Sequence, residues 1–250
     1  MKREEIAVVV GGTGAMGRVI VRRLAQAGLK VIAVGRGADA LSTLAAQVPG
    51  VVGCGADIAA DGAIDEIRAC IDRPVRMVVQ GAGVATAGGV LSAATGALVD
   101  AVNIKVGGML RLVRAVDGHL VRGSRLIAIG GHYGFEPTAY AATAGVANAA
   151  LANLVRQLSW AYGERGVTAH LLAPGPTDTD RLRRVAAERA RLDGSDSETV
   201  LARMLGESAI GAFTTVDQVA WAVATLLAPE ADALAGSTLF MDAGRRRGLP

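Results

Sequence analysis

The most regular feature of the chain is an alternation of short apolar runs with longer segments of helical period. Between the runs, apolar side chains recur on one helical face, as Val19, Ile20 and Leu24 do within residues 18–27. Strands that alternate with helices predict a parallel sheet joined by right-handed crossovers. The runs that we interpret as strands are 6–10, 30–34, 50–54, 75–80, 124–130, 167–172 and 237–241.

Several of these runs are apolar throughout, which is typical of strands covered on both faces. Residues 75–79 read Val-Arg-Met-Val-Val, with one polar position in five. No linker, composition break or repeat divides the chain, so we predict a single α/β domain over residues 1–250, a doubly wound parallel sheet of the Rossmann type. Residues 176–212 are charged and helical outside this alternation, and we interpret them as a flap over the substrate. Ligands bind at the carboxyl edge of such sheets.

Composition limits the kinds of partner. The chain is 51% hydrophobic, but no apolar run approaches the roughly 20 residues of a membrane span. We expect no secretory signal, no membrane partner and a cytoplasmic protein. The two cysteines, Cys54 and Cys70, have neither a disulfide pattern nor metal-ligand spacing, so we expect no metal. A net charge of +3 is too small to indicate nucleic acid.

A glycine-rich segment connects the first predicted strand to the first helix. It can be read as G-x-G-x-x-G from Gly12 or as G-x-x-G-x-x-G from Gly11. Glycines let the backbone approach a pyrophosphate, and the helix N-terminus supplies free amides and a favourable dipole. This context predicts a dinucleotide site that uses Gly11, Thr13, Gly14, Met16 and Gly17.

The end of the second predicted strand indicates which dinucleotide binds. A carboxylate at this position would hold the ribose hydroxyls of NAD, but the chain has Gly35 followed by Arg36. The planar guanidinium of Arg36 suits a 2′-phosphate. We therefore predict NADP(H) as the cofactor, with NAD(H) the weaker alternative.

Further motifs resemble the short-chain dehydrogenase/reductase family over nearly the whole chain. Asp57-Ile58 resembles the family's adenine-contacting pair, and residues 80–83 (Gln-Gly-Ala-Gly) are similar to its Asn-Asn-Ala-Gly turn. Asn103 matches its active-site asparagine, and residues 236–244 resemble its last strand. The resemblance implies further cofactor contacts from Asp57, Ile58, Gly81, Ala82, Gly83, Asn148, Pro174, Gly175 and Thr179.

The family's redox chemistry uses a serine, a tyrosine and a lysine, the last two four residues apart on one helical face. One register makes Tyr140 the tyrosine and puts Ala144 at the lysine position. Another, free of gaps from residue 149 to Pro174-Gly175, puts Gly131 at the serine, Ala144 at the tyrosine and Asn148 at the lysine. We favour the second register because it explains all three positions at once. Either register leaves the lysine position without an amine.

Neither replacement on the helix can supply a proton, because alanine has no polar group and asparagine carries no charge. Asparagine can still hydrogen-bond a ribose. Polar groups nearby are His132, Tyr133, Glu136 and Tyr140. Tyr140 lies one helical turn before the alanine, and His132 titrates near neutral pH. We name Tyr140, His132 and Asn103 as the candidate catalytic residues.

Two functions remain open at this point. The first is an atypical NADP(H)-dependent oxidoreductase of a small carbonyl or alcohol, or a redox-neutral enzyme on the same scaffold. The second is a non-catalytic nucleotide-binding sensor or an inactive partner subunit. The retained Asn103, Pro174-Gly175 and Thr179 favour the first function. The absence of the serine, tyrosine and lysine from the triad positions favours the second function or redox-neutral chemistry. The resemblance also implies a homodimer or homotetramer built on the fourth and fifth helices and the last strand.

Overall fold

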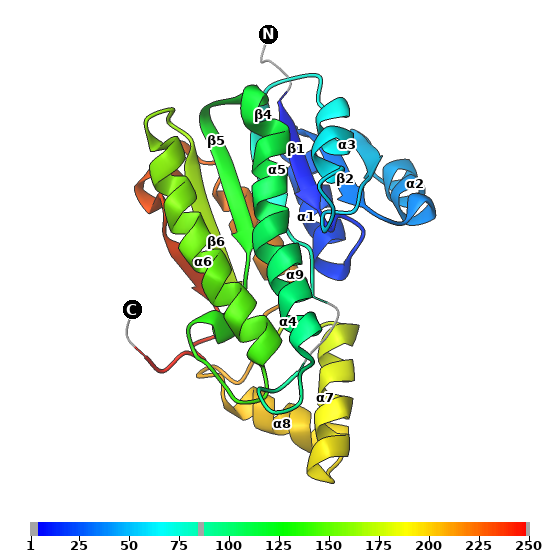
Figure 1. Ribbon diagram of the computed structural model, residues 1–250, viewed down its shortest axis with the longest axis vertical. Helices are drawn as coiled ribbons and strands as arrows, with labels where there is room; N and C mark the ends of the chain where they lie inside the picture. The colour runs from blue at the N-terminus through cyan, green and yellow to red at the C-terminus, as the bar shows by residue number, and fades with distance from the viewer. Residues whose placement is uncertain (1–4, 85–87, 249–250) are drawn as a thin grey trace.

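A seven-stranded parallel sheet forms the centre of the molecule, in the order β3-β2-β1-β4-β5-β6-β7 (Figure 1). The computed structural model describes residues 5–84 and 88–248. Each predicted apolar run forms a strand, so the predicted α/β fold with a doubly wound parallel sheet is confirmed. The strands are β1 (Ile6–Val10), β2 (Lys30–Gly35), β3 (Val51–Gly55), β4 (Val75–Gln80), β5 (Leu120–Ile129), β6 (Thr168–Pro174) and β7 (Thr238–Met241).

Helices cover both faces of the sheet because the side chains of each strand alternate between two apolar clusters. In β1, Ile6, Val8 and Val10 pack into one cluster, and Ala7 and Val9 into the other. One face is covered by α1 (Ala15–Gln26), α2 (Ala38–Gln47) and α9 (Val216–Thr225). The opposite face is covered by α3 (Ala63–Ala69), α5 (Gly108–Val116) and α6 (Ala142–Gly163).

The strand order reverses between β1 and β4, and the turns that follow these two strands touch each other. A Cβ placed on Gly11 would lie 3.0 Å from the Gly81 carbonyl oxygen, and one on Gly81 would lie 3.0 Å from that of Val10. A crevice outside the carboxyl ends of the strands opens at such a reversal, and ligands bind there. The two glycine-containing turns therefore mark the expected ligand position.

Two helices of the predicted flap, α7 (Asp180–Asp193) and α8 (Ser197–Gly206), extend beyond the sheet at the end where α4 (Thr95–Val102) lies (Figure 1). They pack against each other through a small apolar cluster that includes Leu182, Ala186 and Met204. A parallel β-bridge between Thr177 and Thr214 joins the two ends of the segment. The flap therefore has its own small core and a fixed base.

Both cysteines are free thiols, and burial together with Cys70 raises the pKa of the Cys54 thiol to about 12. Within residues 5–84 and 88–248, no helix has the length and apolar character needed to cross a bilayer. In that same part of the chain, no three His, Cys, Asp or Glu side chains group closely enough to hold a metal ion.

A substitution of Gly17, in the first turn of α1, tests how tightly the glycine loop is packed. A Cβ at Gly17 would overlap the carbonyl oxygen of Gly11, whereas one at Gly96 in α4 meets nothing within 4 Å. We expect Gly17→Ala to lower the free energy of unfolding by roughly 1–3 kcal/mol. Gly96→Ala serves as the helical control and should be neutral or slightly stabilising. Equal urea midpoints for the two variants would contradict the close packing of the loop.

Candidate active site

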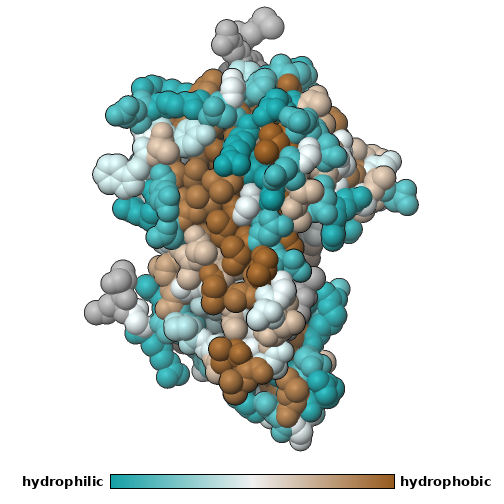
Figure 2. Space-filling model, viewed as in Figure 1, coloured by the Kyte–Doolittle hydropathy of each residue, from teal (hydrophilic) through white to brown (hydrophobic). Residues whose placement is uncertain are grey.

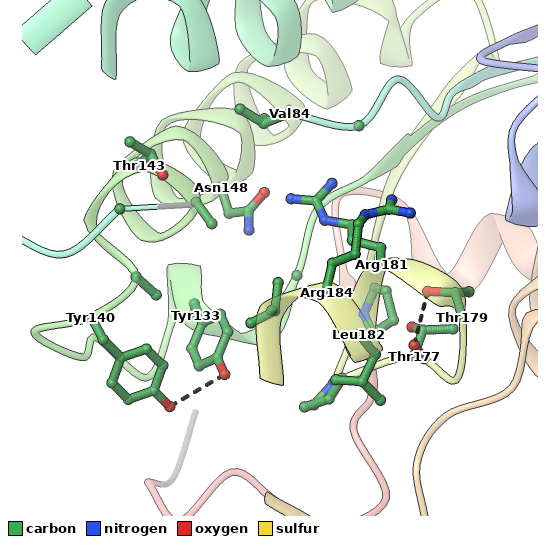
Figure 3. Close-up of a pocket in the computed structure, with 18 of the residues that line it drawn as sticks. Val84, Tyr133, Tyr140, Thr143, Asn148, Thr177, Thr179, Arg181, Leu182 and Arg184 are labelled. Carbon is green, nitrogen blue, oxygen red and sulfur yellow. Dashed lines mark hydrogen bonds between the residues drawn. The ribbon is translucent and has the colours of Figure 1, made fainter. Parts of the chain in front are cut away.

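A pocket of about 980 Å³ lies at the carboxyl ends of β1, β4, β5 and β6 and extends under the flap (Figure 3). Its walls come from segments far apart in the sequence, including the glycine loop, the turn after β4, the start of α6 and helix α7. Because these walls are continuous, one elongated ligand can contact both the glycine loop and the flap. The predicted cofactor residues that line the pocket are Gly11, Gly14, Met16, Gly17, Gly81, Gly83, Asn148, Pro174, Gly175 and Thr179.

The glycine loop presents backbone amides to the pocket. The Gly11 and Gly12 amides donate to the Val34 carbonyl at 2.9 and 3.2 Å, which fixes the loop against β2, and Gly11 has a φ of +75°. Helix α1 then begins after Gly14 without a side-chain cap. The first amides of a helix have no partner within it, so this end is suited to an anionic group such as a pyrophosphate.

Five predicted cofactor residues lie outside the pocket lining: Thr13, Arg36, Asp57, Ile58 and Ala82. Arg36 is exposed directly after β2, and a Cβ on the preceding Gly35 would lie 3.4 Å from the Thr13 hydroxyl. The end of β2 and the glycine loop are therefore neighbours. Asp57 accepts a hydrogen bond from the Ala59 amide at 3.1 Å, and Ile58 is buried.

The turn after β6 also lines the pocket. The Thr177 hydroxyl donates to the Gly175 carbonyl at 3.1 Å, and the Thr179 hydroxyl donates to the Thr177 carbonyl at 3.2 Å (Figure 3). These bonds hold the Pro174-Gly175 turn and bring Thr179 to the pocket at the start of α7. This turn, with its predicted cofactor residues Pro174, Gly175 and Thr179, therefore lines the same pocket as the glycine loop.

Gly131 and Asn148 occupy adjoining space, as the favoured register requires. A Cβ on Gly131 would lie only 2.9 Å from Asn148 Nδ2, so the missing side chain at 131 is the space that the asparagine fills. Asn148 is 5% exposed, and its Oδ1 has no hydrogen-bond partner among the described residues. Ala144, one turn earlier on α6, also lines the pocket. Assigning these positions to the family triad remains a prediction.

The side chain of Asn103 is held by the backbone after β3 and by helix α5. Its Nδ2 donates to the Ala59 carbonyl at 2.9 Å, and its Oδ1 accepts from Arg111 at 2.9 Å. Asn103 is not one of the residues that line the pocket. This placement does not favour direct contact between Asn103 and a substrate.

His132 and Tyr140 both line the pocket, but their surroundings do not favour proton donation. Burial, followed by the charge of Arg245, lowers the pKa of His132 to about 4, so its ring is neutral at pH 7. The Tyr140 hydroxyl lies 3.3 Å from that of Tyr133, and the Arg189 guanidinium lies 3.7 Å from the centre of its ring (Figure 3). Burial and this hydrogen bond raise the pKa of Tyr140, which weakens it as an acid.

Arginines of α7 make the flap side of the pocket cationic. Arg181 and Arg184 both line the pocket (Figure 3), and Arg181 Nη1 lies 3.1 Å from the position of a Cβ on Gly83. The acidic residues of this wall are paired: Glu188 binds Arg191 at 2.7 Å, and Asp180 lies 3.7 Å from Arg183.

Lys105 is a functional group that sequence reasoning missed. Its side chain is 8% exposed and lines the pocket, and its Nζ donates to the Ile129 carbonyl at 2.7 Å. Burial, with a smaller contribution from the charge of Arg181, lowers its pKa to about 8. The available signal was one lysine within the apolar segment Val102-Asn103-Ile104-Lys105-Val106.

A π-helical turn over Asn103–Gly107 positions this lysine between α4 and α5. The Gly108 amide donates to the Asn103 carbonyl, five residues back. The buried Gln80 amide donates to the Ile104 carbonyl at 2.9 Å, and a Cβ on Gly108 would overlap that amide nitrogen. Such turns occur often at functional sites. Here the turn is fixed by an interaction with the end of β4.

Residues 11–246 match the family model described as "Enoyl-(Acyl carrier protein) reductase". The chain belongs to the short-chain dehydrogenase/reductase family, as its motifs predicted. The family match covers every segment that builds the pocket.

Individual relatives are similar over nearly their whole length. The 3-oxoacyl-acyl-carrier-protein reductase of Escherichia coli is 28% identical over 247 residues, which cover 96% of each chain. The structure of a short-chain dehydrogenase/reductase from Serratia marcescens is 26% identical, with a TM-score of 0.85 over 97% of this chain and 98% of the other. The structure of L-sorbose reductase from Gluconobacter frateurii, complexed with NADPH and L-sorbose, is 21% identical, with a TM-score of 0.87 over 99% and 98%.

The close approach of Gly131 and Asn148 gives a double-mutant prediction. We expect Gly131→Ala to destabilise the protein by roughly 1–3 kcal/mol, because the new methyl group displaces the asparagine amide. In an Asn148→Ala background the same change should cost much less, since the space is then free. Urea unfolding of the two single variants and the double variant measures this coupling. Strictly additive effects would contradict the contact.

Proposed function

We propose that this protein is an NADP(H)-dependent oxidoreductase that reduces a small carbonyl compound, or oxidises the corresponding alcohol, beneath the flap. The observation that carries the proposal is the continuous pocket from the glycine loop past Gly131 and Asn148 to α7. The similarity to reductases over almost the entire chain supports the same function.

The residues present fit a dinucleotide. The uncapped start of α1 suits the pyrophosphate, and Thr179 lines the same pocket. Asn148 Oδ1 is buried without a partner in the described chain and can accept a hydrogen bond from a ribose hydroxyl. When bound, NADPH would supply a hydride. The residues of this chain would hold the substrate, exclude water and deliver the proton.

Arg36 tests the preference for NADP(H). If its guanidinium binds the 2′-phosphate, Arg36→Ala should weaken NADPH binding by roughly 10- to 100-fold, the range of a lost charged hydrogen bond. NADH binding should change little. Arg22→Ala is the control, because it also removes an exposed arginine, but one that lies on α1. Fluorescence titration measures both affinities, and equal weakening of the two cofactors would contradict this assignment.

A redox-neutral enzyme or a non-catalytic nucleotide sensor is the second candidate. Gly131 and Ala144 bring no hydroxyl to the pocket, and this observation favours it. NADPH absorbance followed across a panel of aldehydes and ketones separates the candidates. Consumption of NADPH that depends on a carbonyl compound supports the reductase. Tight NADPH binding without consumption by any compound supports the second candidate.

We also infer that the protein forms a homo-oligomer through α4 and α6. Val99 on α4 is 66% exposed, and Val146 on α6 is 49% exposed. Trp160, near the end of α6, is also exposed, and apolar surface gathers over α5 and α6 (Figure 2). Exposed apolar patches of this kind commonly mark interfaces.

A charged substitution tests this surface. Val146→Arg should shift the protein towards the monomer in sedimentation velocity, because the charge would be buried without a partner. Val52→Arg on β3, where the valine is 43% exposed, is the control and should keep the wild-type mass. A wild-type protein that sediments as a monomer at all concentrations would contradict the oligomer.

A further inference from the structure

We propose that Lys105 is the proton donor of this site. Its amine comes from the turn between α4 and α5, whereas the lysine of the family belongs to the helix that corresponds to α6 in the favoured register. This inference rests on the proposed carbonyl reduction. It assigns to Lys105 direct contact with the carbonyl oxygen of the substrate.

The position of the amine supports this role. Lys105 Nζ lies 2.7 Å from the carbonyl oxygen of Ile129, the last residue of β5, and Gly130-Gly131 follow directly. The ammonium therefore lies at the strand end where the favoured register places the family serine. An ammonium has three N–H groups, and the Ile129 carbonyl occupies one of them in the described part of the chain. The remaining donors are available to an oxygen atom in the pocket.

The surroundings place the lysine between its two protonation states near neutral pH. Arg181 faces it from α7, and the uncharged Gln80 and Asn148 belong to β4 and α6. The neutral His132 lies on the loop after β5. Desolvation and the positive charge of Arg181 both lower the pKa of Lys105, to about 8. A group whose pKa lies near the working pH is an efficient acid and base.

The proton step balances with one amine. As the carbonyl carbon accepts the hydride, an N–H bond of the Lys105 ammonium breaks and an O–H bond forms on the substrate oxygen. The product is the alcohol, and the neutral amine regains its proton from water. Since the ammonium is the reactive form, reduction should slow as the pH rises through about 8, whereas alcohol oxidation should accelerate.

Other groups of the pocket are less suitable for this step. His132, with a pKa of about 4, is neutral at pH 7, and the N–H of a neutral imidazole is far too weak an acid for this step. Tyr140 has a raised pKa, and its hydroxyl is bonded to that of Tyr133 near Arg189. Ala144 carries no polar group. Lys105 is thus the pocket residue in the described chain whose acidity and position both suit the step.

The small number of lysines allows a direct test. The chain contains three, Lys2, Lys30 and Lys105, so NMR of protein labelled with ¹³C-lysine resolves each side chain. In the free protein we expect one Nζ to titrate near 8, well below the ordinary range of a lysine. Lys105→Met assigns the shifted signal. Lys30→Met, which removes a surface lysine paired with Asp72 at 3.1 Å, is the matched control.

Kinetics completes the test. Lys105→Met should keep NADPH affinity within a few-fold and lower kcat for carbonyl reduction by roughly 100-fold or more, the usual contribution of a proton donor. Lys105→Arg should also be slow, because a guanidinium holds its proton too firmly, and both variants should lose the pH dependence near 8. Lys30→Met should match the wild type. Thermal unfolding checks that each variant is folded.

The outcomes separate this inference from the proposed function. A Lys105 pKa above about 10 overturns the inference whatever the activity. A shifted pKa with full activity in Lys105→Met also overturns it, while the reductase assignment stands. Absence of NADPH oxidation by the wild-type protein on every carbonyl tested overturns the proposed function and the proton step together.

Discussion

The buried side-chain amide of Gln80 connects the two halves of the pocket. Its oxygen accepts the Ala82 amide at 3.2 Å and orders the turn after β4, where Gly81 and Gly83 line the pocket. Its nitrogen donates to the Ile104 carbonyl and fixes the π-helical turn that contains Lys105. One fully buried residue therefore sets the position of a predicted cofactor turn and of the proposed proton donor. A buried amide must satisfy both of its ends, so the two segments cannot move independently.

The unusual residues of the pocket fit together as one set. Glycine at 131 leaves the volume that the Asn148 amide fills, and glycine at 108 leaves the volume that the Gln80 amide needs. In the favoured register, α6 presents a neutral asparagine where the family has a lysine, but Lys105 brings a cation to the same pocket from another element. The polar groups of Asn148 and Lys105 therefore line one pocket, although they come from different elements.

The sheet could be predicted from the sequence because burial on both faces leaves continuous apolar runs, which are visible without knowledge of the contacts. The glycine loop could be predicted for a similar reason, since its spacing follows from local backbone geometry. The contact between Gly131 and Asn148 could not be predicted in this way. It joins a loop to a helix seventeen positions later, and only the packing shows that a Cβ on Gly131 would lie 2.9 Å from Asn148 Nδ2.

The position of Lys105 in the pocket could not be predicted from the sequence for a different physical reason. A helical period of 3.6 residues assigns faces correctly only in a regular α-helix, whereas the turn over Asn103–Gly107 is wider and changes the direction of the side chains that follow. For Tyr140 the position could be predicted from the sequence, but the acidity could not. Its sequence position correctly places it at the pocket, but its acidity depends on Tyr133 and Arg189, which come from a loop and from the flap.

The pKa of a proton donor can be brought close to neutral pH in two physical ways. A tyrosine needs a nearby cation, because its ordinary pKa of about 10 must be lowered. A lysine needs only removal from water, since desolvation disfavours its charged form. Lys105 follows the second route: the residue is 8% exposed and has Arg181 as a cationic neighbour. Burial of Lys105 within the fold supplies this condition. One desolvated lysine can thus replace the tyrosine and the cation that the family pair provides.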